Sequence, residues 1–183
     1  AQDDSLVLPL PCASFLDLIR MADAIDFTPL EWTQRALANV ESHIGIHPIF
    51  PRAVLASVSL HQGNYAAAQE WLAPFPNISF GENFQINPTG GRQTTIAFIE
   101  LMIARGDVNH AMNIAEEAIV FHRKTGRFVF LPSISHLQAK ASRMLNRADE
   151  AYVLLNDARQ QAEAMQSRYQ LLPILFTLIE MET

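Results

Sequence analysis

Few residues of this chain have the types and spacing that catalysis or ligand binding requires. A glycine-rich run is the first candidate. Residues 90–95 read Gly-Gly-Arg-Gln-Thr-Thr, which superficially suggests a loop that cradles phosphate. The phosphate-loop pattern needs a lysine followed by serine or threonine, with a strand before the loop. The lysine is absent and no strand is predicted there. We therefore interpret the run as a glycine-rich turn that leads into a helix.

The histidines and the single cysteine also lack a catalytic or metal-binding pattern. His43 and His47 are four residues apart, but Gly45 should end the helix between them and no third ligand is indicated. Cys12 has no base near it in the sequence. The sequence therefore predicts no metal site, no cofactor and no enzymatic activity. An all-helical enzyme that uses histidines beside a long loop is the minor alternative.

Composition limits the class of protein. The chain has 183 residues, of which 49% are hydrophobic and 17% charged, so it is long and apolar enough to fold around a core. Its formal net charge is −6 and its 13 basic residues are scattered, which argues against direct binding of nucleic acid. No apolar run approaches the roughly 20 residues of a membrane span. The single thiol fits a cytoplasmic location, and an exported protein with Ala1 as its mature N-terminus is the alternative.

Helices must position whatever site the chain carries, because no stretch shows the alternation of a half-buried strand. Caps, glycines and prolines divide the chain into about nine helices. They are expected near residues 14–25, 28–44, 51–63, 64–73, 93–105, 107–124, 132–145, 148–166 and 169–182. Residues 74–93 are expected to form a long internal loop, of a length that is often functional.

A pattern of a turn followed by a helix start recurs three times. The turns begin at Gly63, Gly106 and Asn146, and each is followed at the same offset by an alanine. These alanines are Ala68, Ala111 and Ala151, which are 43 and 40 residues apart. A period of this length predicts helix pairs stacked into a right-handed α-solenoid, as one repeat domain that is a fragment of a longer protein.

The residues at these turns resemble tetratricopeptide repeats. Gly63, Tyr65 and Ala68 fit the small, aromatic and small positions of that family, and Gly106 with Ala111 fits them again. The third turn has Asn146 in place of the usual glycine, and the periods are longer than in the family. The resemblance implies a divergent array with lengthened helices that binds a partner and does not catalyse a reaction.

A second resemblance covers residues 115–182. Thr125-Gly126-Arg127-Phe128, Leu131-Pro132 and the run from Asn146 to Ala151 are similar to repeat arrays of large bacterial signalling proteins. Those proteins are ATPase-linked transcriptional activators of the maltose-regulator type and ATPase-linked adenylate cyclases. The resemblance implies that the chain is a sensor or scaffold segment of a cytoplasmic regulator.

Such arrays present a concave face that is lined mainly by the first helix of each pair. The repeat register places a mixture of polar side chains there, which suits a peptide or a polar small molecule better than an apolar helix. The predicted groove residues are Ser57, His61, Gln93, Glu100, His136, Lys140 and Arg143.

The last predicted helix, 169–182, is apolar on nearly every side, and such a helix should be buried. Either the array continues past Thr183 or a second copy covers this helix as a homodimer. These features favour a non-enzymatic interaction module that binds a protein or peptide in signalling or transcription regulation. The alternative is an effector-sensing domain that binds a peptide or polar small molecule in the groove, with the 74–93 loop as a lid.

Overall fold

The computed structural model describes residues 49–75 and 88–182, and this part of the chain is all-helical with no strand. The predicted helical class is therefore confirmed. Seven of the nine expected helices lie in the described residues, whereas those at 14–25 and 28–44 fall outside them. The α-helices are α3 (Ile49–His61), α4 (Tyr65–Leu72), α6 (Pro88–Ala104), α7 (Val108–Lys124), α8 (Leu131–Met144), α9 (Ala148–Ala164) and α10 (Arg168–Glu182), and a short 3-10 helix η1 spans Phe128–Phe130.

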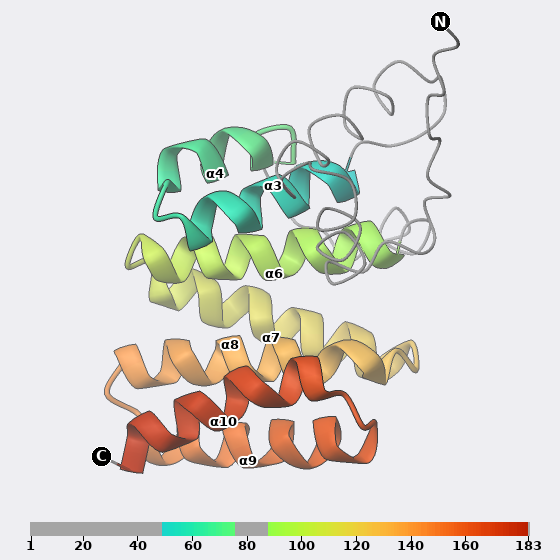
Figure 1. Cartoon of the computed structure of the whole chain (residues 1–183), viewed down its shortest axis with the longest axis vertical. Coiled ribbons are helices and arrows are strands. Elements are labelled where there is room, and N and C mark those ends of the chain that lie inside the picture. Colours follow the sequence, from blue (N-terminus) through green and yellow to red (C-terminus); the bar gives the residue numbers. More distant parts are fainter. Residues whose placement is uncertain (1–48, 76–87, 183) are drawn as a thin grey trace, which may run out of the picture.

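The helices follow one another along the long axis of the molecule, from α3 and α4 at one end to α9 and α10 at the other (Figure 1). Each described helix packs on the described helix that follows it in the sequence. A second set of contacts joins α3 to α6, α6 to α8, and α8 to α10. One helix of every pair therefore belongs to a continuous row, and this row carries the predicted groove residues.

The turns between the helices repeat one backbone conformation. A residue with positive φ follows α3, α6, α7, α8 and α9, and in each case the next amide donates to the carbonyl five residues earlier. This hydrogen bond ends a helix by a left-handed turn, which glycine adopts without steric cost. The positive-φ residues are Gly63, Gly106, Gly126, Asn146 and Gln166.

The expected loop at 74–93 is shorter than predicted at its C-terminal end. Helix α6 begins at Pro88, so residues 88–93 are helical. Proline suits the first turn of a helix because its fixed φ matches and its missing N–H has no partner to lose. Gly90 and Gly91 have poor helix propensity, so the sequence pattern did not predict this first turn. Residues 76–87 lie outside the described residues.

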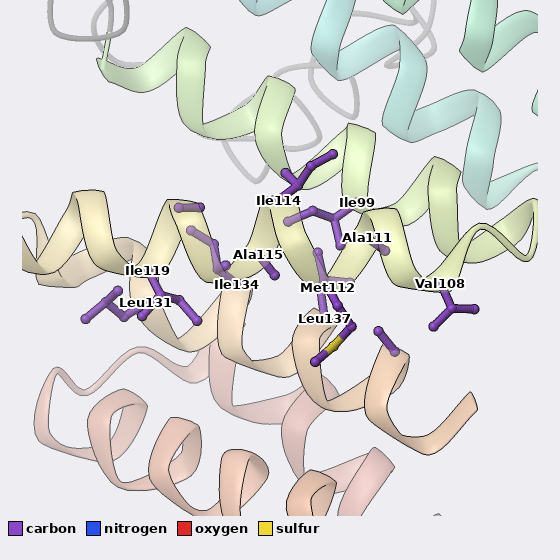
Figure 2. Close-up of a cluster of buried hydrophobic side chains, with 12 residues drawn as sticks. Ile99, Val108, Ala111, Met112, Ile114, Ala115, Ile119, Leu131, Ile134 and Leu137 are labelled. Atoms are coloured by element: carbon purple, nitrogen blue, oxygen red, sulfur yellow. The ribbon is translucent and has the colours of Figure 1, made fainter. Parts of the chain in front are cut away.

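The largest buried cluster lies between α6, α7 and α8 (Figure 2). Ile99 of α6 and Ile134 of α8 are fully buried on either side of α7. The residues of α7 between them include Ala111 and Ala115, which have no exposed surface. Small residues let the helix axes approach closely, so branched side chains of α6, α7 and α8 share one cluster. Two smaller clusters repeat this arrangement around α4 and α9.

Candidate functional site

At the first junction of the row, polar side chains join α3 to α6. The Nε2 of Gln93 donates to the Oγ of buried Ser57 over 3.2 Å. The Nδ1 of His61 lies 2.8 Å from the backbone oxygen of Ser57. A carbonyl oxygen can only accept, so Nδ1 of His61 carries the proton. Three of the predicted groove residues thus form one hydrogen-bonded group.

Glu100 of α6 lies next in the row, and its Oε2 atom is buried without a hydrogen-bond partner. Burial raises the pKa of this carboxyl, while the nearby His61 and Lys140 act in the opposite direction. These neighbours come from α3 and α8, on the two sides of α6. A buried carboxylate oxygen with no donor is costly to keep ionised, and such groups are found more often at functional sites than elsewhere.

His136 and Thr177 connect α8 to α10. The Nε2 of His136 lies 2.9 Å from the Oγ1 of Thr177, and this hydroxyl donates to the carbonyl of Pro173 over 3.0 Å. The hydroxyl has one proton, so Nε2 of His136 must be the donor. Burial, followed by the charge of Lys140, lowers the pKa of His136 to about 4, against an opposing effect of Glu180. His136 is therefore a neutral group at physiological pH.

An open pocket of about 310 Å³ lies beside this row, between α6 and α8. Its lining combines two cationic side chains, Lys140 and Arg143, with the apolar Ile103 and Met144. Arg143 also donates to Glu180 of α10 over 3.1 Å. The pocket can therefore accept an acidic group against Lys140 while an apolar group rests on Ile103 and Met144.

The structure places all seven predicted groove residues on α3, α6 and α8, but it divides them into two kinds. Ser57 and His136 are buried and hold neighbouring helices together. The other five retain exposed surface, and Lys140 is the most open of those at the pocket. Sequence reasoning missed the two apolar lining residues. Ile103 follows Glu100 by three positions and Met144 follows Lys140 by four, so helical spacing was the signal that would have found them.

Replacement of Glu100 by glutamine provides a test of the buried carboxyl. The raised pKa means that the folded protein holds this proton more tightly than the unfolded chain does. Stability is therefore lost as the pH rises through the pKa of the folded state. We expect Glu100→Gln to melt at a higher temperature than the wild type near pH 8, with the difference shrinking near pH 5. Equal melting temperatures at both pH values would contradict this account.

Three further observations concern the part of the chain that the structure describes. His122 is fully buried between the rings of Phe121 and Phe130, with centroids 5.5 and 5.1 Å away, and so belongs to the packing of α7 on η1. Within these residues no three His, Cys, Asp or Glu side chains gather as metal ligands. None of the described helices is both long and apolar enough to cross a bilayer.

Comparison with protein-family models, with curated proteins and with solved structures finds no match for this chain. The class that the described residues define is thus an all-helical protein with serially packed helix pairs and a polar row along one helix of each pair.

Proposed function

We propose that the chain is a tetratricopeptide-like α-solenoid that acts as a non-enzymatic interaction module in a signalling or transcriptional regulator. The observation that carries this proposal is the polar row on α3, α6 and α8. His61, Glu100 and Lys140 come from three successive helices of the row, and the charges of His61 and Lys140 both favour the ionised form of the Glu100 carboxyl. A binding surface of this kind is assembled from several repeats and can follow an extended partner.

The pocket between α6 and α8 indicates the chemistry of that partner. Lys140 offers an exposed, strongly hydrated cation, while Ile103 and Met144 line the same pocket with apolar side chains. A peptide with an acidic residue next to an apolar one matches both features. The overall charge of −6 makes this cationic site a local exception on an acidic protein.

The alternative function is effector sensing by a polar small molecule in the same pocket. The volume of about 310 Å³ lies at the lower end of the range for small-molecule sites. A ligand that binds only the folded state would raise the melting temperature in proportion to its concentration. Such a shift with a metabolite, and none with acidic peptides, would favour sensing over docking.

The experiment that tests the proposal measures binding of a library of acidic-apolar peptides to the full chain by fluorescence polarisation. We expect Lys140→Ala to weaken the selected peptides roughly tenfold or more, because a hydrogen bond to a charged group is worth about 1.5–3 kcal/mol. Lys124→Ala, at the exposed end of α7, is the matched control and should leave affinity unchanged. Failure of the wild type to retain any peptide, or equal losses in both variants, would contradict peptide docking.

A further inference from the structure

The outer side of α10 carries a stripe of exposed large side chains. Tyr169, Leu172, Phe176 and Ile179 keep between 56% and 65% of their surface exposed. Their spacing of three, four and three residues places them on one side of the helix. Ile174, on the opposite side, is fully buried against α9. We call these four exposed residues the α10 stripe.

Earlier helices of the row show that this side is normally covered. Asn146 after α8 follows Gly106 after α6 by 40 residues, and Gln166 after α9 follows Gly126 by the same interval. The same shift relates Leu172, Phe176 and Ile179 to Pro132, His136 and Ala139 of α8. All three residues of α8 are buried, and His136 is covered by α10 itself.

One equivalent position is buried in α6 and α8 but exposed in α10. Ile99 of α6 and Ala139 of α8 have no exposed surface, whereas Ile179, at the equivalent position of α10, is 58% exposed. In α6 and α8 this position belongs to a cluster formed with the helices that follow. The α10 stripe thus corresponds to the packing side of the earlier row helices, and none of the other described helices covers it.

The stripe is symmetric along α10, so a second α10 helix can pack on it in antiparallel orientation. Tyr169 and Ile179 lie equally far from Ile174 along the sequence, as do Leu172 and Phe176. All four lie within about 40° of the line opposite Ile174, at about 100° per residue. Two α10 helices that pack antiparallel around a two-fold axis would therefore set Leu172 of each against Phe176 of the other, and Tyr169 of each against Ile179 of the other.

Charge follows the same symmetry. Arg168 at the start of α10 and Glu182 at its end are both exposed. They lie on the same side of the stripe, about 60° and about 100° from its centre line around the helix axis. Antiparallel pairing brings Arg168 of each copy beside Glu182 of the other. A parallel arrangement would instead place like charges together at both ends.

We propose that the α10 stripe binds the α10 stripe of a second copy of this chain, in an antiparallel two-fold dimer. The interface is separate from the polar row on α3, α6 and α8, so each dimer carries two peptide sites. Because a two-fold interface uses the same patch on both copies, the assembly closes at two and does not extend.

Analytical ultracentrifugation of the full chain over a wide range of concentration tests the proposal. We expect a reversible monomer–dimer equilibrium in the wild type. Phe176→Glu should raise the dissociation constant roughly tenfold or more, because it puts a charge at the centre of the apolar contact. Val120→Glu on α7 is the matched control, since Val120 is 66% exposed against 65% for Phe176, and it should leave the equilibrium unchanged.

A charge exchange tests the antiparallel orientation without disturbing the fold. Arg168→Glu alone should weaken the dimer because it places acidic groups together, and Arg168→Glu combined with Glu182→Arg should restore it. A wild type that stays monomeric, or that forms larger species, would overturn the proposal. Equal effects of Phe176→Glu and Val120→Glu, or a double exchange that fails to restore association, would also overturn it.

Discussion

Replacement of Ile99 by alanine is expected to lower the free energy of unfolding by about 2–5 kcal/mol. Ile99 is fully buried in the cluster of α6, α7 and α8, where the neighbouring alanines are too short to fill the space that it would leave (Figure 2). The cost combines lost transfer free energy with a cavity that the surrounding helices cannot close. Urea unfolding followed by circular dichroism measures the change.

Helix α10 offers a matched control with the same substitution. Ile179→Ala removes the same atoms at the equivalent position of α10, where the side chain is 58% exposed. In dilute solution, where the chain is monomeric, it should change the free energy of unfolding by less than about 1 kcal/mol. Similar losses for Ile99→Ala and Ile179→Ala would mean that burial does not distinguish the two positions as the structure describes.

Acidification is expected to weaken the fold through His136. The pKa of this imidazole is lowered from 6.5 to about 4 in the folded protein. Between these values the unfolded chain takes up a proton that the folded protein does not. Stability is therefore fully present above about pH 6.5 and is lost as the pH falls toward about 4, by up to about 3 kcal/mol. Urea unfolding at a series of pH values measures this slope.

His136→Gln separates this effect from those of the carboxyl groups. The glutamine amide can still donate to the Oγ1 of Thr177 but takes up no proton in this range. We expect the variant to lose stability less steeply than the wild type below about pH 6.5. His110→Gln, at an exposed position of α7, should keep the wild-type slope. A wild-type slope in His136→Gln would show that the imidazole does not remain neutral in the folded state.

The helix ends were the most predictable part of the fold. Glycines and a regular period marked Gly63, Gly106, Gly126 and Asn146, and the structure has a left-handed turn at each. Gln166 adopts the same conformation with φ 53° although its type gives no such signal. There the constraint comes from the packing of α10 on α9, because a helix must reverse at the same distance as in the preceding pairs.

The candidate site was predictable only in its position. The expected register placed the seven residues on the first helix of each pair, and they lie on α3, α6 and α8, because register depends on spacing alone. It could not distinguish Ser57 and His136, whose side chains are buried and hydrogen-bonded between helices, from Lys140, whose side chain is exposed at the pocket. That distinction depends on how closely α6 approaches α3 and α10 approaches α8, and no local pattern in the sequence encodes the approach of helices that are not consecutive.

The contacts along the helix row have a consequence for folding. The main contacts of each described helix are with helices within two places of it, so these contacts close loops of about 40 residues or fewer. Short loops lose little chain entropy on closing, which favours rapid folding from more than one starting point. Among the described helices, α7 packs on a helix on each side, so its amides should be among the last of them to exchange with solvent.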